Sequence, residues 1–502
     1  MNAALKKQTE VFWLSVIVLC LLSFWLQTHL YLHKDVALVS HIAQQFLQGE
    51  TYAHNISDPN PPMIFYLYFV PIIVSKLSGI AVIYTLRTYI LLLIMLSILC
   101  SHGFIKTLLG PPTNRCNKNM AYLLTYGLAY TLLFLPADTF GQREHFYVIL
   151  TTPYLFLAAC RLDNKHVSHI VAIFVGVSAG IGFAIKPFFL LTLLLIELLL
   201  VAQKRHARGW LRPESGICIS IIMLYGLCVL LFYPAYLSTI LPFWMPYFRG
   251  LAVPWTTVIL TPSFIWCCAA IFLYVLKQET AHTKLKTVLI LSITGNLIAY
   301  VIPQVTWYYH IFPALAMSCL YFTLVLGELA DNTNNKTNLG CIGFLTLVIF
   351  FIPVNQSILR SISATLYFHT NNPEKKLIAL FGSTQNKYMF FSMTHKLSHL
   401  EFYSKVQQIG SFTNCIWEYT RLGHYSLPFQ NAMRSYALNF ITHDLNTKKP
   451  QFIIVDVPSS KTYLKQTINF PKEYDQDKKF HAAWSHYTYL TRIPPYDIYQ
   501  RK

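Results

Sequence analysis

The stretch VFWLSVIVLCLLSFWLQTHLYLHKDVALVSHIAQQFLQG, residues 11–49, contains two different helical patterns in direct succession. The first, Val11–Tyr31, is mainly apolar and is long enough to cross a bilayer. The second, Val36–Gln48, places apolar and polar residues on opposite faces of a helix. One carboxylate, Asp35, lies between them. The stretch therefore predicts a membrane span followed by an amphipathic helix at the membrane surface.

The composition of the whole chain agrees with a multi-span membrane protein. Of the 502 residues, 54% are hydrophobic and only 12% are charged, and the mean hydropathy is +0.44. A soluble domain cannot bury this much apolar surface, whereas lipid can solvate it. The formal net charge is +18. Because Lys and Arg gather in short loops between apolar runs, this charge indicates membrane topology and not nucleic-acid binding.

Eleven apolar runs are candidate spans, each of which ideally needs about 20 mainly apolar residues. They are Val11–Tyr31, Ile80–Phe104, Met120–Pro136, Phe146–Ala159, His169–Ile185, Phe188–Ala202, Ile217–Tyr233, Val258–Leu276, Val288–Ile302, Val305–Leu326 and Leu339–Pro353. A further run, Met63–Leu77, is short and follows two prolines. It could be a twelfth span or a helix that lies on the membrane.

The positions of the basic residues distinguish between these two topologies. If Met63–Leu77 does not cross and the N-terminus is cytoplasmic, the basic loops all face the cytoplasm, as the positive-inside rule requires. These loops are Lys106–Lys118, Arg161–His166, Lys204–Arg212, Lys277–Lys286 and Glu328–Lys336. If Met63–Leu77 crosses, every later loop reverses. We therefore predict eleven spans, a cytoplasmic N-terminus and an extracytoplasmic C-terminal region.

The residues after the last span have a different composition and contain no run long enough to cross a membrane. The short apolar segments KKLIALFGS (375–383) and KPQFIIVDVPS (449–459) predict strands, because they end in turn residues. YTYLTRI (487–493) and YDIYQRK (496–502) predict a closing hairpin. These segments favour a small α/β domain outside the membrane.

The predicted fold class is therefore mainly α, a multi-span membrane protein with about 11 transmembrane helices and outer-face juxtamembrane helices, plus a small C-terminal α/β domain. We predict a membrane module over residues 1–355, whose first outer loop is 31–77. The extracytoplasmic domain is predicted over residues 356–502.

Two acids lie in the first outer loop. Asp35 is placed to N-cap the helix Val36–Gln48, which Gly49 would end. Asp58 begins the segment DPNPP, which must be extended because each proline forces its predecessor out of the helical region. Capping for Asp35 and turn formation for Asp58 are local alternatives to a functional role.

Three further groups of polar residues lie at predicted outer ends of spans. The segment ADTFGQREHF brings Asp138 close in sequence to Gln142, Arg143, Glu144 and His145. Lys186 lies between two apolar runs, where it suits an anionic lipid phosphate or snorkels at a turn. The segment PQVTWYYHIFP adds Gln304, Tyr309 and His310. Tyr309 also fits the belt of aromatic residues at a membrane interface.

Metal binding has weaker support. His29 and His33 lie one helical turn apart and His41 follows, but the sequence has no HExxH motif and no CxxC pair. A divalent cation held by the carboxylates Asp35 and Glu144 is the better candidate.

The layout resembles the GT-C glycosyltransferases, which include the protein O-mannosyltransferases and the lipid A aminoarabinose transferases. The layout match covers most of the chain, but the motifs cover only Tyr31–Leu67, Gly141–His145, Lys186-Pro187 and Gln304–Pro313. In place of the H-P-P of the mannosyltransferases, this chain has Asn60-Pro61-Pro62.

The resemblance implies an integral membrane enzyme of the bacterial inner membrane. Such an enzyme takes a sugar from a polyprenyl-phosphate donor, usually undecaprenyl phosphate, and transfers it with inversion. The acceptor would be an envelope glycan, a lipid or a protein at the outer face of the lipid bilayer.

The resemblance also implies roles for the residues named above. Asp35 would be the general base on the acceptor hydroxyl. Lys186, Arg143 and His310 would stabilise the leaving phosphate. Glu144 would orient Arg143 or assist the acceptor, and Asp58 would hold the donor sugar or brace its loop. The remaining candidate substrate-binding residues are Gln142, His145, Gln304 and Tyr309.

Three other classes of function remain as alternatives. One is a non-catalytic scaffold or receptor whose C-terminal region binds a partner, but it leaves the polar cluster Gln142–His145 unexplained. A transporter or flippase of lipid-linked glycans predicts polar residues through the mid-membrane region and repeated helix bundles. Here the polar groups gather at span ends, and no repeat is visible. An O-antigen ligase or polymerase uses similar substrates, but its large outer loop normally lies between late spans and not at the C-terminus.

Overall fold

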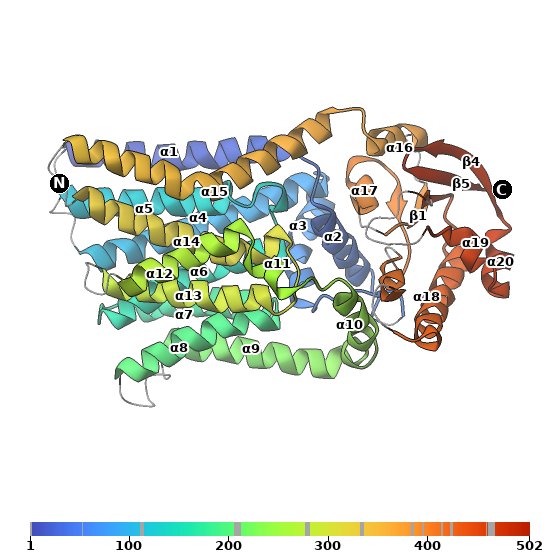
Figure 1. Ribbon diagram of the computed structural model, residues 1–502, viewed down its shortest axis with the longest axis horizontal. Coiled ribbons are helices and arrows are strands. Elements are labelled where there is room, and N and C mark those ends of the chain that lie inside the picture. Colours follow the sequence, from blue (N-terminus) through green and yellow to red (C-terminus); the bar gives the residue numbers. More distant parts are fainter. Residues whose placement is uncertain are drawn as a thin grey trace. The chain divides into compact units, whose positions relative to one another are not determined.

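The computed structural model describes residues 3–52, 54–110, 115–204, 212–276, 282–331, 336–382, 386–393, 396–412, 415–421, 425–457, 459 and 467–502 (Figure 1). The chain forms two compact units. The helical unit comprises Met1–Leu30, Arg87–Leu227 and Val253–Thr365, and the sheet unit comprises Tyr31–Leu86, Cys228–Ala252 and Leu366–Lys502.

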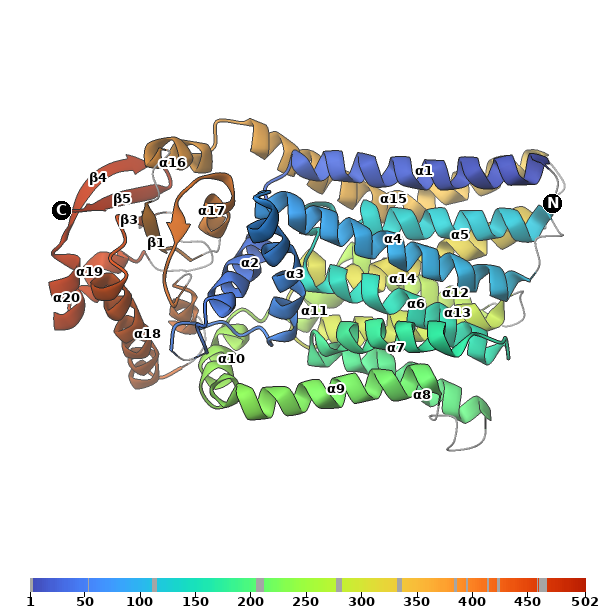
Figure 2. The same ribbon diagram turned by 180° about the vertical axis from the view of Figure 1, so that it is seen from behind.

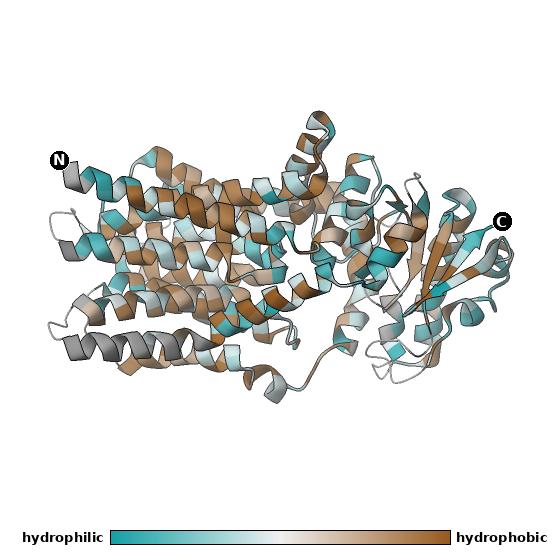
Figure 3. Cartoon of the chain, turned by 90° about the horizontal axis from the view of Figure 1, so that it is seen from above, coloured by the Kyte–Doolittle hydropathy of each residue, from teal (hydrophilic) through white to brown (hydrophobic). Residues whose placement is uncertain are grey.

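Apolar helices dominate the helical unit, and Figure 3 shows many of the drawn helices mainly in the brown of hydrophobic residues. They are α1 (Ala3–Thr28), α4 (Val82–Leu109), α5 (Arg115–Leu133), α6 (Arg143–Leu162), α7 (His169–Ala184), α8 (Leu190–Lys204), α9 (Pro213–Phe232), α12 (Pro262–Leu276), α13 (Thr283–Val301), α14 (Tyr308–Asp331) and α15 (Lys336–His369). Among the described residues, six helices are both long and apolar enough to cross a membrane, and shorter apolar helices accompany them. The predicted multi-span helical class is confirmed.

Each predicted apolar run overlaps one main helix, with one exception, and several runs extend a few residues past the ends of that helix. The run Val258–Leu276 is broken by a turn at Leu260 and Thr261 into the short α11 (Trp255–Ile259) and α12. Parts of four predicted cytoplasmic loops, residues 111–114, 205–211, 277–281 and 332–335, lie outside the described residues. The predicted orientation in the membrane stays a prediction.

Small residues allow close helix packing around α13. Helix α6 packs against α7, α13 and α14 (Figure 2). Helix α13 also packs against α8, where a Cβ on Gly295 would lie only 2.6 Å from Thr192 Oγ1. Because glycine has no Cβ, the two backbones approach closely, as is common between membrane helices. This approach positions the next residue, Asn296, which lines the site described below.

The sheet unit contains a five-stranded sheet in the part of the chain that the structure describes, with strand order β2-β1-β3-β5-β4. Its strands are β1 (Lys387–Phe391), β2 (Gln407–Gln408), β3 (Phe452–Asp456), β4 (Tyr487–Ile493) and β5 (Tyr496–Arg501). Strand β1 is parallel to β2 and β3, whereas β5 is antiparallel to β3 and β4. The predicted strand in KPQFIIVDVPS is therefore confirmed as β3, and the predicted hairpin as β4–β5.

Helices in the sheet unit come from all three of its segments. They are α2 (Lys34–Leu47), α3 (Met63–Ser78), η4 (Tyr236–Ile240), α10 (Leu241–Gly250), α16 (Pro373–Phe381), η5 (Lys396–His399), α17 (Leu400–Tyr403), η6 (Ile416–Arg421), α18 (Leu427–Thr447), α19 (Phe470–Tyr474) and α20 (Lys478–Trp484). The sheet core includes Tyr388, Ile454 and Ile498, and the helical residues Leu377 and Phe381 pack against it.

The predicted strand in KKLIALFGS is wrong, because this segment forms helix α16. Asn372 N-caps the helix by accepting a hydrogen bond from Lys375 N at 2.9 Å, and Pro373 occupies the first helical turn. Leu377 and Phe381, four residues apart, both enter the core. The helical spacing and the cap outweigh the short apolar run.

Two details predicted for helix α2 are also wrong. His33, not Asp35, is its N-cap, and Asp35 lies in the first turn. The polar face is only partly exposed: His41 and Gln45 are buried and bond to Glu401 and to the Gly410 carbonyl of the same unit, whereas Gln48 is exposed. The predicted end is correct, since Gln48 closes the helix and Gly49 follows with a φ of +88°.

The compact units divide the chain differently from the predicted modules. The first outer loop and the segment Cys228–Ala252 group with the C-terminal residues, and α15 continues past residue 355. The boundary at 355 as a functional division stays a prediction. Whether α3 lies on the membrane or crosses it also stays a prediction.

Candidate active site

Three segments that are distant in sequence meet at one site in the helical unit. Helix α6 begins at Arg143, after a turn in which Gly141 has a φ of +85°. Lys186 is extended, with a φ of −142°, because it precedes Pro187 at the start of η2 (Pro187–Phe189). The first turn of α14 supplies Tyr309 and His310. All three segments are among those that the sequence singled out.

An ion pair between the buried Glu144 and the half-buried Lys186 forms the centre of this site. Lys186 Nζ donates to Glu144 Oε1, and Glu144 is only 1% exposed. Its other oxygen, Oε2, has no hydrogen-bond partner within the described residues. Buried ion pairs need further hydrogen bonds to offset desolvation, so this oxygen marks a place where a ligand or water can bind.

A small cavity adjoins the pair, with about 270 Å³ of space that is partly open to solvent. Its lining combines the two charged groups with an imidazole ring, a side-chain amide and apolar side chains. The lining residues are Glu144, Lys186, His310, Asn296, Phe188, Phe189, Ala299 and Pro313.

Tyr309 brings a second cation to the site. The Arg143 guanidinium lies 5.9 Å from the centroid of the Tyr309 ring, and Lys186 Nζ lies 6.0 Å from the same centroid. The His310 ring lies beside this tyrosine, at 4.7 Å between centroids. With two cations and one carboxylate, the cluster has a net positive formal charge. It can therefore hold an anion such as a phosphate.

Other predicted site residues take part in the architecture. His145 is buried and uses both ring nitrogens, since Nδ1 accepts from Gly141 N at 3.0 Å and Nε2 donates to the Leu132 carbonyl at 2.8 Å. Gln142 is the N-cap residue of α6. Gln304 has a φ of +51° in the turn before α14, where its carbonyl accepts from Val253 N at 2.8 Å. Substrate binding by these three stays a prediction.

Asn296 is a lining residue that the sequence reasoning missed. It lies inside the predicted span Val288–Ile302, is buried, and donates from Nδ2 to the Ser292 carbonyl at 2.8 Å. An amide inside an apolar run was the available signal, because polar groups there are costly. Phe188 and Phe189 carried no such signal, since aromatic residues are common in membrane helices.

Asp35 and Asp58 belong to the sheet unit. Asp35 is 9% exposed and lies in the first turn of α2, where the helix dipole favours a negative charge. Its Oδ2 lies 3.9 Å from Nδ1 of His33. The carboxylate is therefore held at a helix N-terminus beside an imidazole.

Asp58 is the acceptor in a tight turn. Its Oδ1 accepts from Asn60 N at 2.8 Å, and Tyr52 and Tyr236 donate to the carbonyls of Asn60 and Pro59. These bonds brace the DPNPP segment and support the bracing role. A contact of Asp58 with the donor sugar stays a prediction.

The donor set for a metal is poor. The described residues contain no group of three or more His, Cys, Asp or Glu side chains that could hold an ion. Glu144 is paired with Lys186, and His41 with Glu401. A divalent cation held by Asp35 and Glu144 stays a prediction.

A helical membrane unit together with a small α/β sheet unit is the architecture expected for a GT-C glycosyltransferase. No family model matches the chain, and no curated protein matches its sequence. The fold is similar to that of ArnT from Cupriavidus metallidurans bound to undecaprenyl phosphate, with a TM-score of 0.57 at 11% identity, covering 98% of both chains. The same protein in the apo state gives 0.55 at 12% identity, covering 99% of this chain and 98% of that one. The predicted GT-C fold is confirmed.

Proposed function

We propose that this chain is a membrane glycosyltransferase that moves a sugar from a polyprenyl-phosphate donor to an acceptor hydroxyl. The observation that carries the proposal is the net-positive cluster beside a small cavity, in which the half-buried Lys186 and Arg143 accompany the buried Glu144. The fold supports it, because the similar ArnT structure was solved with undecaprenyl phosphate bound. The proposed donor lipid is accordingly of the undecaprenyl-phosphate type.

In the proposed reaction, the acceptor oxygen forms a bond to the anomeric carbon of the donor sugar. The bond from that carbon to the phosphate oxygen breaks on the opposite face, which inverts the configuration. Its electron pair stays with the phosphate, and the hydroxyl proton passes to Asp35 as general base. Atoms and charge balance, because the lipid phosphate gains the negative charge that the carboxylate loses.

The cations act on the leaving phosphate. Its charge rises as the bond breaks, so donors that are already in place stabilise the transition state more than the ground state. We assign this role to Lys186 and Arg143, with His310 as a further donor. Glu144 positions Lys186, and the Tyr309 ring keeps both cations close to each other.

The proposed location is the bacterial inner membrane, with transfer at its outer face to an envelope glycan, lipid or protein. Mass spectrometry of envelope glycans from cells with and without the gene tests the function. We expect one glycan to lose a single sugar. Loss of a whole polymer would instead indicate a ligase or polymerase. Cytoplasmic accumulation of an unaltered lipid-linked glycan would indicate a transporter.

The proposed topology predicts which introduced cysteines a membrane-impermeant maleimide will label. In spheroplasts, Ala482→Cys on the exposed side of α20 should react, because the C-terminal region is placed outside. His166→Cys, in a predicted cytoplasmic loop, should react only after detergent treatment. The unsubstituted chain gives the background from its native cysteines. The opposite labelling pattern would reverse the orientation.

A further inference from the structure

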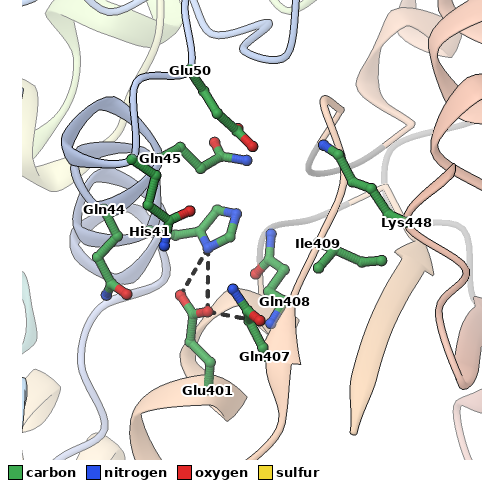
Figure 4. Close-up of a pocket in the computed structure, with 10 residues that line it drawn as sticks. His41, Gln44, Gln45, Glu50, Glu401, Gln407, Gln408, Ile409 and Lys448 are labelled. Atoms are coloured by element: carbon green, nitrogen blue, oxygen red, sulfur yellow. Dashed lines mark hydrogen bonds and ion pairs between the residues drawn. The ribbon is translucent and has the colours of Figure 1, made fainter.

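A second polar pocket, separate from the Glu144–Lys186 cluster, lies within the sheet unit. It is bordered by α2, by the segment around β2 and by Lys448, which ends α18 (Figure 4). The pocket contains about 330 Å³ of space, part of it open to solvent. Five glutamines dominate its lining: Gln44, Gln45, Gln48, Gln407 and Gln408.

Several buried polar atoms of this pocket have no hydrogen-bond partner among the residues that the structure describes. His41 is 4% exposed and is fixed by Glu401, whose two carboxylate oxygens lie 3.0 and 3.2 Å from its Nδ1. The other ring nitrogen, Nε2, has no partner within the described residues, and Figure 4 shows it turned toward the open space beside α2. Gln408, 1% exposed, likewise has neither amide atom bonded there.

Such atoms point to a ligand because unsatisfied groups are expensive. A buried polar atom without a partner costs about 1–3 kcal/mol, and native proteins contain few of them. Glu50 adds a further unbonded oxygen, Oε2, to the same pocket. Four unbonded atoms in one pocket, from residues on two different segments, are consistent with a bound molecule that completes their hydrogen bonds.

The lining also defines the chemistry of that molecule. A primary amide is uncharged and both donates and accepts, which is the pattern that a hydroxyl group matches. Glu401 and Glu50 oppose an anion, and Lys448 opposes a cation. Burial raises the pKa of the Glu50 carboxyl, while Lys448 and His41 act in the opposite direction. The best match is a neutral molecule with several hydroxyl groups.

We infer that this pocket binds a neutral sugar ring of the acceptor glycan. The assignment to the acceptor rests on the proposed function, whereas the sugar chemistry rests on the glutamines, His41 and Glu50. The pocket would hold the acceptor chain by a ring that does not react.

Saturation-transfer difference NMR on the full chain in lipid nanodiscs tests this inference. The probes are methyl α-D-glucopyranoside, methyl α-D-galactopyranoside and N-acetylglucosamine, with inorganic phosphate followed by ³¹P line width. The double variant Gln44→Ala/Gln407→Ala removes two amides that are not fully buried, so folding should be retained. We expect it to weaken sugar binding at least tenfold. The control Gln476→Ala, at an exposed turn, should leave binding unchanged.

The outcomes separate the pocket from the proposed function. No saturation transfer to any sugar, or equal transfer in the double variant, would overturn the inference, as would broadening of the phosphate signal alone. A Lys186→Ala chain that binds the sugars normally but transfers none would support both proposals. Amide-dependent sugar binding in a chain whose deletion alters no glycan would retain the pocket and reject the transferase.

Discussion

Replacing Asp35 with asparagine is expected to abolish sugar transfer while the chain still folds and inserts. Asparagine has nearly the same shape, but it cannot accept the proton of the acceptor hydroxyl. Loss of a positioned general base typically lowers the rate about 10²–10⁴-fold. The readout is recovery of the missing sugar when the variant is expressed in cells that lack the gene. Binding of undecaprenyl phosphate to the purified variant should be unchanged, since this carboxylate is not assigned to the donor phosphate.

A matched control separates catalysis from helix stability. Asp35 lies at the start of a helix, so its neutralisation also removes a favourable dipole interaction of about 0.3–1 kcal/mol. Asp477 likewise lies at a helix start, where its Oδ1 accepts from Lys479 N and Phe480 N at 2.9 Å. Asp477→Asn should lose a similar amount of stability and keep full transfer. Full transfer by Asp35→Asn would exclude this residue as the base.

Removal of the Lys186 ammonium should lower sugar transfer about as strongly as the Asp35 substitution, but through loss of a donor to the phosphate. We expect Lys186→Ala to lower transfer about 10²–10³-fold, because a charged donor to the leaving phosphate is lost. Binding of undecaprenyl phosphate should weaken as well. The single variant also leaves Glu144 buried without its cation, which typically costs about 3–5 kcal/mol of stability. Thermal unfolding must therefore be measured beside activity.

The double variant Glu144→Gln/Lys186→Met resolves this ambiguity. It removes both charges at similar volume, so stability should largely return while transfer stays lost. Lys286 and Glu328 supply the matched control, since they form another buried lysine–glutamate pair in the helical unit. Lys286→Met/Glu328→Gln should keep transfer. If the first double variant transfers sugar normally, the cluster is only structural.

Most of the helical fold could be predicted from the sequence, because hydropathy is a local property. The length of each apolar run can be read directly from the sequence. Only the run Val258–Leu276 is divided into two helices, by the turn at Leu260 and Thr261. The C-terminal domain was harder. The composition of the apolar residues in α16 is compatible with a strand. A helix forms instead, because Asn372 caps it and because Leu377 and Phe381 are spaced four residues apart.

The sequence identified the residues of the candidate site, but it did not show which of them form pairs. Glu144 and Lys186 were both identified, yet the expectation was that the carboxylate would orient Arg143 or assist the acceptor. Their pairing joins positions 42 residues apart and depends on how α6 packs beside η2. For the same reason, nothing in the sequence showed that His41, on the polar face of α2, would be buried and bonded to Glu401.

The close contact of Gly295 with Thr192 has a consequence for how such a site can diversify. A side chain at position 295 would meet backbone atoms of Thr192 at 2.8–3.0 Å, so α13 and α8 would have to separate. Asn296 would move with α13, and the cavity would widen without any change in its charges. A substitution at the uncharged position 295 would then change, by size alone, which lipid phosphate headgroup the cavity accepts. Comparing undecaprenyl phosphate with the bulkier undecaprenyl diphosphate as ligands of Gly295→Ala and the unsubstituted chain would measure this, and an unchanged preference would contradict it.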